Sequence, residues 1–140
     1  MTYLLDTNVV SETRRPLRLP IKVANWFKAT SDEAMFLSAA TILEIEVGVR
    51  RLERQDPRQG AILRHWKDQL LTPAFRRRIL PIDEDVATVC GGLHVPDPRP
   101  LRDSLIAATA IVHKLVVVTR NVADFRLMAV QVFDPWTGEP

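Results

Sequence analysis

Hydrophobic and polar residues alternate along the chain in two different rhythms. Short apolar runs predict buried strands at 2–5, 34–38, 79–82, 115–119 and 129–133. Longer segments carry apolar residues at helical spacing and predict helices at 7–15, 21–30, 39–54, 60–78, 83–94 and 101–114. Because the two kinds of segment alternate, the pattern predicts an α/β fold with a mostly parallel sheet.

Length limits this fold to a single domain. With 140 residues, of which 46% are hydrophobic, the chain has enough apolar material for one core and too little for two. We expect the domain to span residues 1–135 and the segment WTGEP, residues 136–140, to form a short, loose C-terminal tail.

The single cysteine and the distribution of apolar residues predict the cellular compartment of the protein. Cys90 has no second cysteine to pair with and lies in an apolar run, so we expect a buried thiol in a reducing compartment. The start of the chain lacks the pattern of a signal peptide, and no run of 18 apolar residues occurs. These features predict a cytoplasmic protein with no membrane role.

The net charge and the arginine clusters do not by themselves predict a function. The formal net charge is only +2, but 15 arginines stand against 4 lysines, with clusters at 14–15, 50–51 and 76–78. Arginine suits bidentate contacts with phosphate or carboxylate. Solvated helix faces explain such clusters equally well, so charge does not by itself predict nucleic-acid binding.

Acidic residues occupy positions that the fold would bring together. Asp6 follows the first strand, and Thr119, Asn121 and Asp124 follow the strand at 115–119. The carboxyl ends of parallel strands lie at one edge of a sheet, where ligands bind. Glu44 and Asp103 lie on helices that follow sheet elements.

Each of these acids also has a purely structural interpretation. Asp6 could cap the first helix, and Asp124 could be an ordinary turn residue. Glu44 stands three residues after Thr41, which matches a capping box if that helix begins late. Glu44 and Glu46 would point about 200° apart on a helix, so they cannot share a site. Asp103 is the most informative acid, because it heads a stripe of small residues that can pack tightly on a sheet.

Four carboxylates in one crevice would repel one another unless a cation lay among them. Oxygen ligands without histidine or cysteine favour Mg²⁺ or Mn²⁺ over zinc. The three histidines match no ligand spacing and are expected to be structural or on the surface. A carboxylate-held divalent ion can activate water and neutralise a phosphate, so hydrolysis of a phosphodiester is the natural chemistry.

Four segments carry a family resemblance: LLDTNVVSE, LSAATILEIEVGV, RDSLIAATA and VVVTRNVADF. They resemble, in order and over nearly the whole chain, the motifs of the PIN-domain family, and most closely its VapC-type ribonuclease toxins. The resemblance implies a three-layer α/β/α fold with a central parallel sheet in the order 3-2-1-4-5. It also implies an Mg²⁺- or Mn²⁺-dependent endoribonuclease that uses activated water and leaves 5′-phosphate and 3′-hydroxyl ends.

The resemblance also assigns residues. Catalytic and metal-binding roles fall to Asp6, Glu44, Asp103 and Asp124, and supporting roles to Asn8, Thr119 and Asn121. The implied partners are an RNA substrate, with tRNA as one candidate, and a cognate small antitoxin that wraps the toxin's helices, in a homodimer or a higher toxin–antitoxin assembly. The helices around Trp26, Phe27 and 62–71 are candidates for these interfaces, although their large apolar side chains could equally belong to the core.

Two other functions fit parts of the sequence. Haloacid-dehalogenase phosphatases also place an aspartate after the first strand, but they need a second aspartate two residues later, where this chain has Asn8. A non-catalytic PIN module that acts through protein–protein binding is the remaining alternative. The presence of all four acids argues against it.

Overall fold

Five parallel strands form the centre of the molecule. The structure is a computed structural model that describes all 140 residues. Its strands are β1 (Tyr3–Leu5), β2 (Met35–Ser38), β3 (Ile79–Leu80), β4 (Val116–Val118) and β5 (Val132–Phe133). They lie in the order β3-β2-β1-β4-β5, and β1 pairs with β2 on one side and β4 on the other. The predicted α/β class and sheet order are therefore confirmed.

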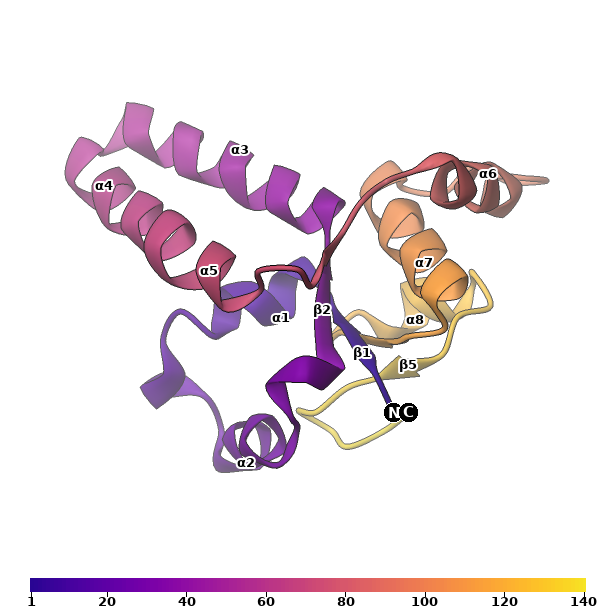
Figure 1. Cartoon of the computed structure of the whole chain (residues 1–140), viewed down its shortest axis with the longest axis horizontal. Coiled ribbons are helices and arrows are strands. Elements are labelled where there is room, and N and C mark those ends of the chain that lie inside the picture. Colours follow the sequence, from indigo (N-terminus) through magenta and orange to yellow (C-terminus); the bar gives the residue numbers. More distant parts are fainter.

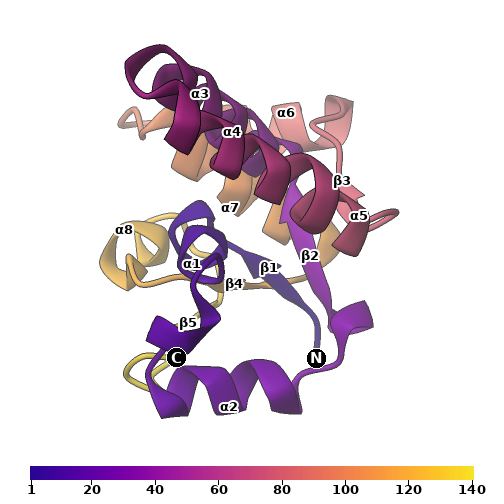
Figure 2. The same ribbon diagram turned by 90° about the vertical axis from the view of Figure 1, so that its left-hand side faces the viewer.

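Helices cover both faces of the sheet (Figures 1 and 2). The α-helices are α1 (Thr7–Glu12), α2 (Ile21–Ala29), α3 (Ala39–Gln55), α4 (Pro57–His65), α5 (Thr72–Ala74), α6 (Glu84–Leu93), α7 (Leu101–His113) and α8 (Val122–Arg126). Two 3₁₀ turns, η1 (Pro16–Arg18) and η2 (Asp32–Ala34), and a π-helical segment, η3 (Trp66–Leu71), complete the chain.

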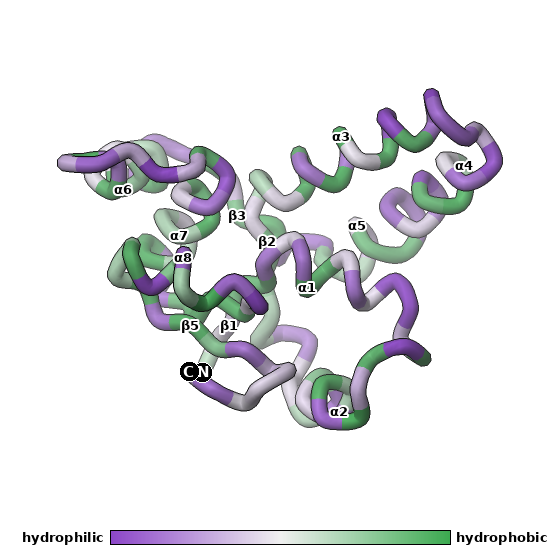
Figure 3. Tube along the Cα trace, turned by 180° about the vertical axis from the view of Figure 1, so that it is seen from behind, coloured by the Kyte–Doolittle hydropathy of each residue, from purple (hydrophilic) through white to green (hydrophobic).

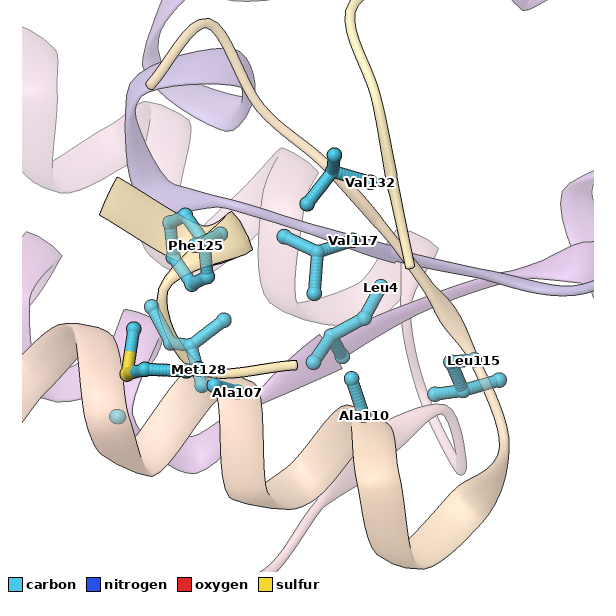
Figure 4. Packing of buried hydrophobic residues seen from close by; sticks show 10 residues of the cluster. Leu4, Ala107, Ala110, Leu115, Val117, Phe125, Met128 and Val132 are labelled. Atoms are coloured by element: carbon cyan, nitrogen blue, oxygen red, sulfur yellow. The ribbon is translucent and has the colours of Figure 1, made fainter. Parts of the chain in front are cut away.

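The core lies in two halves, one on each face of the sheet. Because successive strand residues point to opposite faces, Leu4 joins a cluster with α7 and α8, whereas Leu5 joins one with α1 and α3. Val117 and Val118 divide in the same way. Figure 4 shows the first half, where Ala107 and Ala110 let α7 approach Leu4 and Val117. Figure 3 shows the matching contrast between apolar strands and polar outer helix turns.

Side-chain caps fix where several helices begin. Ser38 caps α3 by accepting a hydrogen bond from Ala40 N at 3.0 Å, and Asp56 caps α4 in the same way from Gln59 N at 3.2 Å. Since α3 begins at Ala39, Thr41 lies inside the helix. The capping-box interpretation of Glu44 is therefore wrong.

The structure differs from the predicted elements in several places, and both α1 and β3 end before the predicted residues 15 and 82. The helix expected at 60–78 is a run of α4, η3 and α5, with π-helical hydrogen bonding in its middle. Helix α8 was not predicted, and the last strand is confined to two residues. The buried thiol of Cys90 is confirmed. No helix has the length and apolar character needed to cross a membrane.

The C-terminal segment is fastened to the rest of the chain rather than loose. Asp134 and Glu139 form an isolated antiparallel bridge, and Lys22 Nζ donates to Thr137 O at 2.8 Å. Trp136 packs against the cluster around Leu5. The domain boundary at residue 135 stays a prediction.

Candidate active site

Asp6 lies at the carboxyl end of β1 and is almost completely buried. Its backbone N–H donates to Val118 O at 2.9 Å, which extends the ladder to β4 by one residue. One carboxylate oxygen, Oδ1, accepts from Thr7 N at 2.8 Å at the start of α1. The other, Oδ2, accepts from Thr119 Oγ1 at 2.8 Å. Asp6 is thus the predicted helix cap, and the fold also holds both of its oxygens in fixed positions.

Thr119 provides the matching group at the end of β4. It is fully buried, and its N–H donates to Phe133 O at 3.0 Å. Its hydroxyl gives its hydrogen to Asp6 and accepts one from Asn121 N at 2.9 Å. Thr119 therefore links the strand end, the turn that leads into α8, and the carboxylate of Asp6.

Glu44 reaches the site from the first turns of α3. Thr7 Oγ1 donates to Thr41 Oγ1 at 3.1 Å, which ties the start of α1 to the start of α3. One turn after Thr41, the half-buried Glu44 accepts from Arg102 Nη1 at 3.0 Å. This ion pair joins α3 to the first turn of α7.

Asp103 and Asp124 occupy the first turns of α7 and α8. Asp103 is half-buried at the head of the predicted small-residue stripe, whose Ala107 and Ala110 are buried against the sheet. Asp124 is exposed, one residue before the fully buried Phe125 that anchors α8 in the core (Figure 4).

Electrostatic coupling joins the four acids. Burial raises the pKa of Asp6, and the charge of Asp103 raises it further, against hydrogen bonds from Thr119 and Thr7 that lower it. Burial also raises the pKa of Glu44, with smaller contributions from Asp6 and Asp103. The pKa of Asp103 is raised by burial and by Asp124. Asp103 is therefore the acid whose charge interacts with each of the other three.

Arg102 is the cation that opposes this repulsion. Its positive charge lowers the pKa of Asp6, Glu44 and Asp103, although burial and repulsion outweigh it at each. Arg102 was not predicted as a site residue from the sequence. Its one signal is its place beside Asp103, outside the arginine clusters at 14–15, 50–51 and 76–78.

The supporting asparagines behave differently from Thr119. Asn8 is exposed on α1, and Asn121 is exposed at the start of α8 and uses its backbone N–H to bond Thr119. Neither carboxamide is hydrogen-bonded to one of the acids. Their predicted supporting role stays a prediction.

Glu46 is not part of this group, as predicted from its position on α3. It pairs instead with Arg50, Arg64 and Lys67 on the far side of the helix. Among the histidines, His94 is held by Ser104 Oγ at 2.8 Å and by Arg99 N, while His65 and His113 are exposed. No three acidic, histidine or cysteine side chains lie close enough together to hold a metal ion as they stand.

Comparison with known proteins identifies the family of the chain. The family described as "PIN domain" matches residues 3–130. The chain belongs to the PIN-domain family. Within it, the chain is 36% identical over 138 residues to Toxin FitB of Neisseria gonorrhoeae, covering 95% of this chain and 97% of that protein. It is 30% identical over 140 residues to VapC ribonuclease Y4jK of Sinorhizobium fredii, covering 95% and 96%.

A solved structure gives the same answer for the fold. The crystal structure of FitAcB from Neisseria gonorrhoeae superposes with a TM-score of 0.86 at 36% identity, covering 96% of this chain and 99% of that one. This PIN-domain chain thus shares its sheet order and helix layers with a solved relative.

Proposed function

We propose that this PIN-domain chain is a divalent-metal-dependent endoribonuclease and the toxin of a toxin–antitoxin pair. The observation that carries the proposal is the placement of four acids from separate elements, Asp6 at the end of β1, Glu44 in the early part of α3, and Asp103 and Asp124 in the first turns of α7 and α8. The relatives' names, a toxin and a ribonuclease, support the biological class.

The donor set suits Mg²⁺ or Mn²⁺. It consists of carboxylates alone, three of them with raised pKa values. A hard divalent cation would stabilise the ionised forms of these carboxyls, which burial first and mutual repulsion second disfavour. We assign Asp6, Glu44, Asp103 and Asp124 as its ligands and as the catalytic residues. When bound, such an ion supplies a water of lowered pKa and neutralises charge on the phosphate.

The chain's own contribution is to position these groups. Both oxygens of Asp6 are fixed by hydrogen bonds, so its carboxylate cannot turn away from the strand end. Glu44 and Asp103 come from two different helices, α3 and α7, which the ion pair between Glu44 and Arg102 joins.

Arginines near this edge suit the RNA backbone. Arg14, Arg15 and Arg18 line a polar hollow of about 270 Å³ beyond the end of α1, together with Ser11 and Glu12. Burial and the neighbouring Arg15 lower the pKa of Arg14, as expected for cations held close together. A phosphate in this hollow would relieve that repulsion.

The antitoxin that we propose as partner would cover exposed apolar side chains. Ile62 and Leu70 are more than half exposed on α4 and η3. Trp26 and Phe27 are half-buried and pack edge to face, with ring centroids 5.0 Å apart. Of the predicted interface residues, Ile62 and Leu70 are therefore the ones available to a partner. We expect Ile62→Asp with Leu70→Asp to abolish antitoxin binding in a pull-down and to leave RNA cleavage unchanged.

RNA cleavage by the purified, antitoxin-free chain tests the activity. The assay uses total tRNA and mixed cellular RNA with Mg²⁺ or Mn²⁺, and compares EDTA and Asp103→Asn with the unaltered chain. We expect cleavage that both controls abolish. Cleavage that persists in EDTA would refute the metal site. Absence of both cleavage and metal binding would favour a non-catalytic PIN module that acts through protein–protein contacts.

A further inference from the structure

The ion pair between Arg102 and Glu44 is unusual in this molecule because of where it lies. The other acids that pair with arginines are Glu12, Glu46, Glu53 and Asp68, none of which belongs to the proposed metal site, whereas Glu44 does. Arg102 also directly precedes Asp103 in the first turn of α7. One residue thus places a positive charge among carboxylates that the proposed function assigns to a divalent cation.

The two partners differ in their freedom to move. The side chain of Glu44 is 14% exposed, whereas that of Arg102 is 68% exposed and makes no other hydrogen bond. The guanidinium therefore approaches Glu44 from solvent on a long, flexible stem. Because the guanidinium is exposed and its side chain makes this one hydrogen bond, another cation can take its place on the carboxylate.

Arginine released at this position would lie at the open side of the site. Its planar fork matches phosphate geometry, and its charge does not depend on pH in the range where proteins are folded. The first turn of α7 carries both the exposed Arg102 and Asp103, so this arginine lies directly beside the proposed metal site.

We propose that Arg102 is an internal counter-ion of the carboxylate site, which holds Glu44 in the metal-free chain and contacts the RNA phosphate backbone once a divalent cation has taken its place. This inference rests on the proposed function and adds a residue to it. Arg102 is a positioning and phosphate-binding residue in this account, and the chemistry stays with the acids.

The test compares two arginines that differ mainly in location. Arg102→Gln is the test variant, and Arg50→Gln is the matched control, because Arg50 is 75% exposed and pairs with Glu46 on the same helix α3 at 2.6 Å. Both changes remove one charge from an exposed side chain, so both variants should fold. Arg102→Lys keeps the charge and loses the fork.

Metal affinity is the first readout, measured by calorimetric titration with Mn²⁺ without RNA. We expect Arg102→Gln to bind Mn²⁺ about three- to fivefold more tightly than the unaltered chain, because an exposed competitor has been removed. Arg50→Gln should bind as the unaltered chain does, and Arg102→Lys should lie between. Equal or weaker binding by Arg102→Gln would overturn the proposal.

RNA binding is the second readout, measured with a short labelled single strand at several salt concentrations. Ca²⁺ replaces Mg²⁺ in one arm and EDTA in the other, and gels check that the RNA stays intact. With Ca²⁺, we expect the salt slope of Arg102→Gln to be smaller by about 0.7, the value for one lost phosphate contact. In EDTA the slopes should agree, since Arg102 then stays on Glu44.

Two failures can be told apart. If the unaltered chain binds Mn²⁺ but Arg102→Gln changes neither affinity nor slope, the inference fails and the metal site stands. If the unaltered chain binds no Mn²⁺ at all, the proposed metal site fails and the inference fails with it.

Discussion

Glu44 and Glu46 lie two residues apart on α3 and have opposite environments. Three cations, Arg50, Arg64 and Lys67, surround Glu46, and Arg64 contacts it through both Nη1 and Nη2. These bonds hold the pKa of Glu46 far below its ordinary value. Glu44 has one cation and two acidic neighbours, and burial raises its pKa.

The difference separates two uses of a carboxylate. The group around Glu46 has its charges matched within the chain, and it fastens α3 to α4 through Arg64. The group around Glu44 has an excess of negative charge, so its ionised form opposes folding until a cation arrives. An acidic group that is left unbalanced at a sheet edge favours a binding function, and a balanced one favours a structural role.

The largest expected effect is on RNA cleavage. It distinguishes Asp103, an acid of the unbalanced group around Glu44, from an acid of the balanced group around Glu46. We expect Asp103→Asn to lower RNA cleavage by at least about a hundredfold, because a bound metal ion supplies several kcal/mol of transition-state stabilisation. Asp68→Asn is the matched control, since Asp68 pairs with Lys67 beside Glu46. Initial rates on the same RNA measure both. Similar rates for the two variants would erase the distinction between the groups.

Thr119 allows a sharper comparison between two buried threonines. Thr119→Val removes two bonds, the one to Asp6 and the one from Asn121 N, whereas Thr109→Val removes one bond to Leu105 O within α7. Each lost bond should cost about 1 kcal/mol of unfolding free energy, so Thr119→Val should be the more destabilising change. Only Thr119→Val should also weaken Mn²⁺ binding in calorimetry. The bond from Thr119 lowers the pKa of Asp6, and this substitution removes that bond. Equal Mn²⁺ affinities in the two variants would show that Thr119 does not orient the site.

Glu46→Gln and Glu44→Gln should have opposite patterns of effect on the melting temperature and on RNA cleavage. Glu46→Gln should lower the melting temperature by a few degrees, since Arg64 and Lys67 lose a shared partner. Cleavage should stay unchanged. Glu44→Gln should abolish most cleavage and leave the melting temperature in EDTA nearly unaltered. Thermal melts and initial rates on both proteins decide the matter, and a larger loss of stability in Glu44→Gln would contradict the comparison.

The pH dependence of stability should show the same contrast with a smaller effect. In the metal-free chain, Asp6, Glu44 and Asp103 keep their protons above the ordinary values of 3.8 and 4.5. Their contribution to stability is therefore present below those values and is lost as pH rises through the raised ones. Glu46 behaves oppositely, since its contribution is present above 4.5 and is lost in acid.

Asp103→Asn removes one member of the raised group and provides the measurement. In EDTA at pH 7 we expect it to raise the unfolding free energy by roughly 0.5 to 1 kcal/mol, the size of one partly exposed charge interaction. Urea unfolding from pH 4 to 7 should show a flatter profile than the unaltered chain. Destabilisation at pH 7 would mean that Asp103 is satisfied in the metal-free fold.

Sequence patterns predicted the parts of the fold that rest on local periodicity. The strands β1, β2 and β4 and the helices α3 and α7 lie within a residue or two of their expected positions. Helix α8 was not predicted because its five residues are too few to show a helical period. The π-helical hydrogen bonding of η3 was not predicted because the spacing of its apolar residues is the same as in an ordinary α-helix.

The site was predicted unevenly for a related reason. The acids stand at strand ends and helix starts, which the alternation of elements reveals, whereas the sheet order came from the family resemblance. The pairing of Arg102 with Glu44 spans 58 residues, and that of Arg64 with Glu46 spans 18. Both require knowing which helices pack together, so local pattern could not distinguish the balanced acid from the unbalanced one.

A Mn²⁺ titration of thermal stability tests the central claim most directly, because it needs neither RNA nor an antitoxin. A ligand that binds only the folded chain adds about 2.7 kcal/mol at a hundred times its Kd. We predict that the melting temperature of the unaltered chain rises steadily with Mn²⁺, that Asp68→Asn follows it, and that Asp103→Asn loses most of the rise. An equal rise in Asp103→Asn, or no rise in the unaltered chain, would contradict the assignment of these four carboxylates to a metal site.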